Sequence, residues 1–287
     1  MMRCSISPIL YLAVCAGLLP GIRVQTTGAA QPLHRAHAHN DYYHDRPLLD
    51  ALDHGFAGVE ADVFLVDGAL LVGHARDELH PDETLEALYL KPLLAHVTRR
   101  GGRVYEDGSG VILLIDFKAD GPDAYRALDD LLVDYASMLT TRVNDTVTEG
   151  PVTVVISGDR PWDLIAADET RYAGLDGRLA NLEDALPTSL LPLISDRWTA
   201  HFTWTGEGDM PASERQRLEA IVTKAHEKGR KVRFWATPDA PGPEREAVWR
   251  VLHEAGVDLI NTDDLAGLKA FLGKRQTGTP ITPGGND

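Results

Sequence analysis

Short apolar runs typical of β-strands alternate along this chain with segments of helical spacing, and this alternation constrains the fold more than any other feature. The strand-like runs include residues 57–65, 110–118 and 152–158, and the segment 123–139 is a long amphipathic helix by its spacing. Two of the runs are almost wholly apolar, as in parallel strands that are buried on both faces. Alternating strands and helices predict a parallel sheet, and about eight such units predict a closed (β/α)8 TIM barrel.

A doubly wound open sheet is the alternative architecture for the same alternation. However, no G-x-G-x-x-G follows the first predicted strand at 33–39, and no P-loop occurs, which disfavours the nucleotide-binding versions of that sheet. No linker or internal repeat divides the chain. We therefore predict one barrel domain over residues 31–274 and a disordered tail over residues 275–287.

The N-terminal thirty residues have the pattern of an export signal. Arg3 supplies a positive charge, and residues 9–19 form an apolar run that is short for a bilayer span. Small residues at 28–30 offer a cleavage site, with an earlier cut near Val24 and an uncleaved anchor as alternatives. We predict a signal peptide over residues 1–30 and a secreted or periplasmic protein.

Cysteine content and charge exclude several classes of function. Cys4 and Cys15 both lie in the predicted signal peptide, so the mature chain would have no disulfide, thiolate metal site or cysteine nucleophile. The net charge of −15 argues against nonspecific binding to nucleic acid or anionic membrane, which requires clustered Lys and Arg. We expect a monomer with no nucleic-acid partner and no stable membrane insertion after signal cleavage. A phosphate-containing small molecule is still compatible, because a bound cation reverses the local sign.

Acidic side chains stand near the ends of predicted strands, where barrel enzymes carry their active sites. Glu60 and Asp62 are two positions apart within an apolar strand, so they share one face and are poorly placed for a solvated surface. Asp116 and Lys118 repeat this spacing, with a buried Asp–Lys ion pair as the alternative reading. We predict that Glu60, Asp62 and Asp116 bind one divalent cation. An all-oxygen site suits Mg²⁺ first and Ca²⁺ second, rather than Zn²⁺.

Histidines flank this acidic group in the sequence. His37 and His39 follow the first predicted strand, either as a metal-ligand pair or as part of an acid/base site. His74 ends an apolar run. A lone histidine on such a strand is usually structural, but its position beside the Glu60–Asp62 pair favours catalysis.

The order of these motifs resembles the glycerophosphodiester phosphodiesterase-like superfamily, which includes sphingomyelinase D-like enzymes and phosphatidylinositol-specific phospholipases C. The resemblance spans roughly residues 33–272, and its "HAHNDY" opening is closest to a phosphodiesterase-like branch. It is carried by the His37/His39 pair, Glu60-Ala61-Asp62-Val63, the Asp67-Gly68 turn, Leu71-Val72-Gly73-His74, Asp116-Phe117-Lys118 in its sphingomyelinase D form, and Trp235. The His-Arg-Gly and Pro-Glu-Asn-Thr elements of glycerophosphodiesterases are absent, so other diesters stay open as substrates.

The resemblance implies a phosphodiesterase that acts on a phospholipid head group or a glycerophosphodiester-like molecule with one divalent cation. It implies that Lys118 contacts the phosphate and that Trp235 lines the pocket. Trp204 is a second candidate, either for the pocket or for rim packing.

For catalysis the resemblance implies two histidines, one near the first strand and the other His74, acting as general base and acid. We prefer His37 for the first role, with Asn40 or Asp41 orienting it or the substrate. The choice between His37 and His39 stays open, because residues two apart on a strand share a face. The attacking group is either water or a hydroxyl of the substrate.

Two other functions compete with this interpretation. An amidohydrolase-like or PHP-type metal hydrolase would use His37 and His39 as ligands, but it needs further histidines after the middle strands. Those strand ends instead carry Ser157-Gly158-Asp159, Leu175-Asp176 and Ser195-Asp196. A non-catalytic secreted binding protein on the same barrel is the other alternative.

Overall fold

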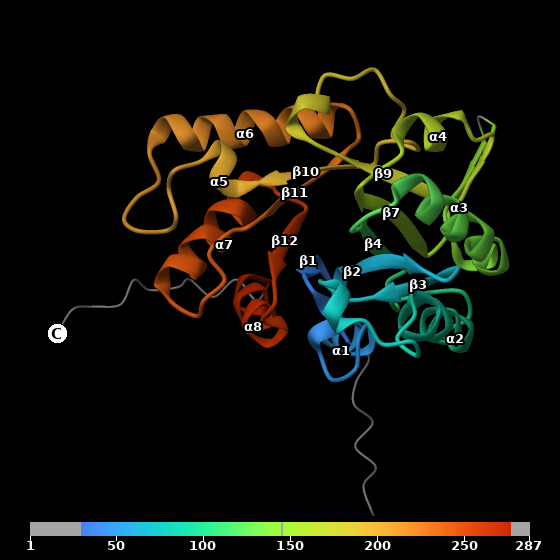
Figure 1. The fold of residues 1–287 in the computed structure, drawn as a ribbon. Coiled ribbons are helices and arrows are strands. Elements are labelled where there is room, and N and C mark those ends of the chain that lie inside the picture. The colour runs from blue at the N-terminus through green and yellow to red at the C-terminus, as the bar shows by residue number, and fades with distance from the viewer. Residues whose placement is uncertain (1–29, 145, 277–287) are drawn as a thin grey trace, which may run out of the picture.

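The computed structural model describes residues 30–144 and 146–276, in which eight parallel strands close into a barrel (Figure 1). Neighbouring strands follow the chain order, and β1 closes the barrel by pairing with both β12 and β2. The barrel strands are β1 (Leu33–Ala38), β2 (Phe56–Val66), β4 (Val111–Phe117), β7 (Val152–Gly158), β9 (Ala173–Gly177), β10 (Leu193–Arg197), β11 (Lys231–Trp235) and β12 (Leu259–Thr262). The predicted single-domain (β/α)8 barrel is confirmed.

Helices cover the outside of the barrel and connect most of its strands (Figure 1). They are α1 (Leu49–His54), α2 (Lys91–Arg99), α3 (Gly121–Leu132), α4 (Trp162–Ala167), α5 (Trp198–His201), α6 (Ala212–Glu227), α7 (Pro243–Ala255) and α8 (Leu265–Gln276). Their ends follow local sequence: α7 starts with a proline and stops at Gly256, whose φ of 88° suits glycine. From β9 to β10 the chain makes only a 3₁₀ turn, Leu179–Asn181. None of these described helices has the length and apolarity to cross a membrane.

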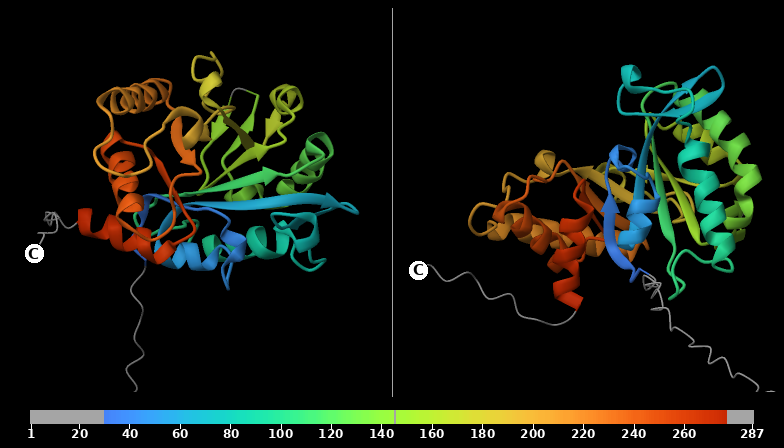
Figure 2. Two further views of the ribbon diagram at one scale, coloured as in Figure 1. Left: turned by 60° about the vertical axis from the view of Figure 1, so that its left-hand side comes forward. Right: turned by 90° about the horizontal axis from the view of Figure 1, so that it is seen from below.

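Strand β2 is longer than the other barrel strands and forms an antiparallel hairpin with β3 (Ala69–Val72). This hairpin projects beyond the barrel in Figure 2. Asp67 and Gly68 at its turn both have positive φ, 49° and 83°, as a type I′ turn requires. The hairpin returns the chain to the barrel, where the Gly73 amide donates to the Asp62 carbonyl at 3.1 Å. It therefore delivers His74 to the end of β2.

A separate small sheet has the order β6 (Thr146–Thr148), β5 (Thr141–Val143) and β8 (Thr170–Arg171). Sequence reasoning did not predict it, because these short strands are largely exposed and carry little hydrophobic pattern.

Inside the barrel, the inward-facing side chains change from apolar to polar along the strands. Leu114, Val155, Leu193 and Leu259, with Ile112, form a buried apolar layer. Towards the C-terminal strand ends, the next inward positions carry polar groups, such as Asp116 and Ser157, which are partners in the β4–β7 register. A cavity of about 330 Å³ at the opposite, N-terminal end lies on the other side of the apolar layer. The apolar layer thus separates this cavity from the polar groups at the C-terminal mouth.

The predicted signal peptide over residues 1–30 falls almost entirely outside the described residues, as does the predicted tail from residue 277 onward. Both stay predictions. Helix α8 reaches Gln276, two residues beyond the predicted end of the domain.

Candidate active site

A pocket of about 260 Å³ opens at the C-terminal ends of the barrel strands. Its lining residues are His39, Asn40, Glu60, Asp62, His74, Asp116, Lys118, Ser157, Arg178, Arg233 and Trp235. The structure thus brings the predicted site residues together in one pocket, except His37 and the two alternative candidates Asp41 and Trp204, which are buried outside it.

The three predicted metal ligands converge because β2 and β4 are neighbours and Asp62 is the register partner of Asp116. One ligand atom from each of Glu60, Asp62 and Asp116 lies within 4.8 Å of the others, and no second such cluster of His, Cys, Asp and Glu occurs in the described part of the chain. The Oδ1 atom of Asp62 is buried without a hydrogen-bond partner among the described residues. Burial raises the pKa of Asp116 to about 6. A small divalent cation with oxygen ligands fits this donor set, since it would satisfy the unpartnered oxygen and offset the mutual repulsion.

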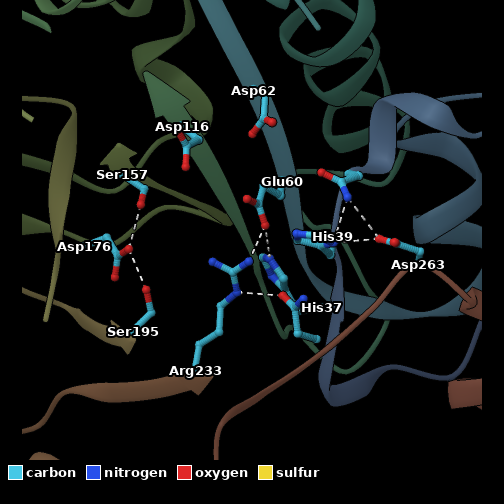
Figure 3. Close-up of polar contacts among 12 residues, drawn as sticks. His37, His39, Glu60, Asp62, Asp116, Ser157, Asp176, Ser195, Arg233 and Asp263 are labelled. Carbon is cyan, nitrogen blue, oxygen red and sulfur yellow. Dashed lines mark hydrogen bonds and ion pairs between the residues drawn. The ribbon is translucent and has the colours of Figure 1, made fainter. Parts of the chain in front are cut away.

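Below the carboxylate cluster, Glu60 forms a buried ion pair with Arg233, whose Nη2 donates to Glu60 Oε2 (Figure 3). The Nε of Arg233 donates to Asn261 Oδ1 at 2.8 Å. Burial alone would raise the pKa of Glu60, but Arg233 and the hydrogen bond from His37 hold that pKa below its usual range. Glu60 therefore stays ionised and firmly oriented.

His37 is fully buried, and its Nε2 lies 3.3 Å from Glu60 Oε2. Burial and the neighbouring Arg233 lower the pKa of His37 to about 4, so the imidazole is neutral near pH 7. A neutral ring with its Nε2–H on Glu60 orients that carboxylate, and it cannot reach a molecule in the pocket. The sequence-based preference for His37 as the acid/base group thus has no support in this geometry.

His39 occupies the pocket wall two positions further along the chain. Its Nδ1 lies 2.7 Å from Asp263 Oδ1, and the Asn40 side-chain amide lies near both groups (Figure 3). Burial lowers the pKa of His39, but the hydrogen bond to Asp263 and the charge of Glu60 outweigh it and raise that pKa above its usual value. With Nδ1–H donated to Asp263, the Nε2 of His39 is available as a proton acceptor.

His74 lies beside Asp62, with its Nδ1 2.9 Å from Asp62 Oδ2, and its side chain is 57% exposed. The same Asp62 oxygen accepts a hydrogen bond from Tyr42 at 2.7 Å and lies 2.6 Å from the Lys118 ammonium. Lys118 also lies 3.6 Å from Asp116 Oδ1. Burial lowers the pKa of Lys118, but the charges of Asp116 and Asp62 outweigh burial and raise that pKa above its usual value. The side chain therefore remains a cation.

The two tryptophans differ in position. Trp235, at the end of β11, lines the pocket and has the Arg197 guanidinium 5.6 Å from its ring centre. Trp204 is buried, its Nε1 donates to the Glu207 carbonyl at 2.9 Å, and it is not part of the pocket. Of its two predicted roles, Trp204 therefore has the packing role.

Sequence reasoning missed Arg233, Arg178 and Tyr42 as members of the site. The signal for the first two was strand alternation: Arg233 is two positions before Trp235, and Arg178 is two after Asp176. Tyr42 lies in a short turn after β1, so no periodic pattern placed it at the pocket.

Two family models match parts of this chain. The sequence model of the AIM6-like phosphodiesterase domain matches residues 25–175, and that of the glycerophosphoryl diester phosphodiesterase family matches residues 231–266. An altered inheritance of mitochondria protein 6 homolog from Arthroderma benhamiae is 32% identical in an alignment of 269 positions that covers 82% of this chain and 83% of that protein. Altered inheritance of mitochondria protein 6 from Eremothecium gossypii is 31% identical over 83% of this chain and 69% of its own length.

Similar solved structures include a glycerophosphoryl diester phosphodiesterase from Parabacteroides distasonis, with a TM-score of 0.49 and 14% identity over 90% of each chain. A phosphatidylinositol-specific phospholipase C from Listeria monocytogenes gives a TM-score of 0.48 and 8% identity over 84% of this chain and 92% of that one. The predicted superfamily and the predicted enzyme class, a phosphodiesterase, are confirmed by the family matches. On the match to residues 25–175 and the identity to its relatives, the chain belongs to the AIM6-like phosphodiesterase family.

Proposed function

We propose that this protein cleaves a small-molecule or lipid phosphodiester by general acid–base catalysis with one divalent cation. The observation that carries the proposal is the pocket itself. His39, His74 and Lys118 line it together with the three-carboxylate cluster. A cation held by Glu60, Asp62 and Asp116 would neutralise charge on the phosphoryl oxygens.

The two imidazoles have different surroundings, which suggest different roles. His39 is the more sheltered, and its Nδ1 is held by Asp263, so its Nε2 is suited to accept the proton of the attacking hydroxyl or water. His74 is largely exposed at the pocket mouth, where a leaving group departs into solvent, so it is suited to protonate the leaving oxygen. Asp62 orients His74 through Nδ1.

Lys118 and Trp235 bind the substrate in this proposal. The Lys118 ammonium projects into the pocket from the end of β4 and can donate to a phosphoryl oxygen. Trp235 supplies an aromatic wall for the part of the substrate next to the phosphate. The amidohydrolase-like alternative is not favoured, since His37 lies outside the pocket and is fully buried.

The metal requirement is tested by stripping the protein with EDTA and titrating Mg²⁺, Ca²⁺ and Zn²⁺ by calorimetry, alongside turnover of bis(p-nitrophenyl) phosphate and lysophospholipids. We expect Mg²⁺ or Ca²⁺ to bind and restore turnover. Asp116→Asn should weaken cation binding about 10- to 100-fold, the loss typical of altered metal sites. Asp123→Asn is the matched control, because the Asp123 side chain is exposed on the outer face of α3. Turnover that survives EDTA, or an Asp116→Asn variant with unchanged affinity, would contradict the metal site.

The acid–base pair is tested by His39→Gln and His74→Gln, each expected to lower kcat about 10²- to 10⁴-fold. His80→Gln is the control, since His80 is exposed in the loop after the β2–β3 hairpin. Full activity of His39→Gln together with an inactive His37→Gln would restore the role to His37.

Export is the remaining part of the proposal, and its support is the apolar run at residues 9–19 with small residues at 28–30. Expression of the full chain in a bacterium, followed by N-terminal sequencing of periplasmic or secreted protein, tests it. We expect a mature N-terminus near residue 31. Recovery of an intact chain in the cytoplasm alone would contradict export.

A further inference from the structure

A second polar network occupies the adjoining part of the barrel wall, on β7, β9 and β10, and is centred on the fully buried Asp176 of β9. Its Oδ2 accepts hydrogen bonds from Ser157 at 2.8 Å and Ser195 at 2.6 Å (Figure 3). The same oxygen accepts a hydrogen bond from Arg178 Nη1 at 2.7 Å. Asp176 thus holds the Arg178 guanidinium at the pocket wall, which Arg178 helps to line.

A second guanidinium shares this carboxylate. Arg160, just after β7, has its Nη1 4.0 Å from Asp176 Oδ2, and its side chain is only 13% exposed. The Nε and Nη1 of Arg160 are buried without a hydrogen-bond partner among the described residues. Burial, and then the charge of Arg178, lower the pKa of Arg160. Two neighbouring guanidinium groups therefore share the buried carboxylate of Asp176, and Asp116 and Asp159 are also near enough to act on Arg160.

The other cations of the pocket are already paired. Lys118 lies between Asp62 and Asp116, and Arg233 is bound to Glu60. None of these contacts involves Arg178 or Arg160. Among the lysine and arginine side chains that line the pocket, Arg178 is thus the one whose ion pair, with Asp176, lies outside the metal cluster.

The spacing of the strands sets the distance between the two charged regions. Ser157 on β7 is the register partner of Asp116 on β4, and β9, with Asp176, is the next strand. Adjacent strands are about 4.8 Å apart, so the backbones of β4 and β9 are roughly 10 Å apart, and side chains that project from both into the barrel can contact one substrate.

Resting on the proposed phosphodiesterase activity, we propose that Arg178 forms a second anion subsite at the pocket wall, backed by the buried Arg160, and that the substrate carries a further oxyanion. This group, a carboxylate or a phosphoryl group, lies within roughly 10 Å of the scissile phosphorus, across the two strand spacings. Guanidinium groups recognise both kinds of oxyanion through paired N–H donors. The subsite makes the enzyme selective for anionic head groups over neutral or cationic ones.

The test compares two matched diesters, phenyl p-nitrophenyl phosphate and 4-carboxyphenyl p-nitrophenyl phosphate, in the presence of Mg²⁺. We expect the wild-type protein to prefer the carboxylated diester in kcat/KM. Arg178→Gln and Arg160→Gln should each reduce that preference about 10- to 100-fold, mainly through KM. Arg178→Lys should retain part of it. Arg126→Gln, on exposed α3, should keep the wild-type ratio. Thermal melting verifies that each variant is folded.

A binding measurement separates this inference from the proposed activity. Calorimetry with phenylphosphonate, 4-carboxyphenylphosphonate and 1,4-phenylenediphosphonate compares one anionic group with two and shows which second oxyanion binds better. If the diesters are cleaved but the second anion improves neither kcat/KM nor affinity, the subsite is refuted while the activity stands. If no diester is cleaved but the second anion tightens binding and Arg178→Gln removes that gain, the subsite is supported and the activity is refuted.

Discussion

Replacing Arg233 by methionine removes the guanidinium that pairs with the buried carboxylate of Glu60. The two side chains are only 3% and 6% exposed, so water cannot take over the role of the missing cation. Removing one partner of a buried ion pair typically costs about 3–5 kcal/mol. Asn261 also loses the hydrogen bond that it accepts from Arg233. We therefore expect Arg233→Met to lower the free energy of unfolding by roughly 3–5 kcal/mol, a large share of the 5–15 kcal/mol of a typical domain.

The assay is urea and thermal unfolding in EDTA, followed by circular dichroism, on Arg233→Met, Glu60→Gln and the double variant. The melting temperature of Arg233→Met should fall by roughly 6–20 °C, given the size of the domain. The double variant should lose less than the sum of the single losses, because it leaves no unpaired buried charge. Mg²⁺ should recover part of the loss in Arg233→Met, since a cation beside Glu60 replaces the missing charge.

The matched control for this cycle is Arg126→Met, which breaks an exposed ion pair with Asp123 on α3 and should cost under about 1 kcal/mol. Our reasoning would be refuted if Arg233→Met cost no more than this control, or if the losses of Glu60→Gln and Arg233→Met were simply additive.

Three further predictions concern other groups near the site. Asp263→Asn should lower the pKa of His39, because Asp263 raises that pKa in the wild-type protein. The acidic limb of the pH profile of kcat/KM on bis(p-nitrophenyl) phosphate should then move to lower pH. A limb that does not move would show that His39 is not the general base. Burial raises the pKa of Asp41 to about 7 in the folded protein. Because the unfolded chain releases this proton at a lower pH than the folded protein, wild-type stability should fall by roughly 2–3 kcal/mol from pH 5 to pH 8. Urea melts of Asp41→Asn should show a flatter dependence of stability on pH. Gly58→Ala would place a Cβ 2.3 Å from His37 Nδ1. We therefore expect thermal melting to show a loss of about 1–3 kcal/mol in the free energy of unfolding. A variant as stable as the wild type would show that the His37 ring can move.

Much of the metal cluster could be predicted because it depends on local periodicity and one general rule. Glu60 and Asp62 share a strand face by their spacing, and Asp116 ends another strand of the same parallel sheet. Since parallel strands end at one side of a barrel, the three carboxylates had to approach each other. The exposed hairpin β5–β6 carries no such periodicity, so it was not predicted.

The choice between the two histidines could not be made in the same way. His37 and His39 face the same side of the chain. Strand alternation predicts which face a side chain lies on, but it does not predict how far along the barrel axis the side chain lies. The depth follows from the register of β1 against β12, in which His37 is level with Asn261 and so lies inside the closed barrel. His39 follows the strand and reaches Asp263 at the mouth.

The sequence by itself determined the strand and helix alternation, hence the barrel, and the residue types at each strand end, hence an acidic, histidine-containing site. These properties are local, since each depends on spacing within a few residues of one segment. Only the tertiary structure decided that His39 rather than His37 lines the pocket, that Arg233 pairs with Glu60, and that two arginines share Asp176. The pair of Glu60 and Arg233 joins strands far apart in the sequence, and barrel closure and strand register set how deep each of these side chains lies.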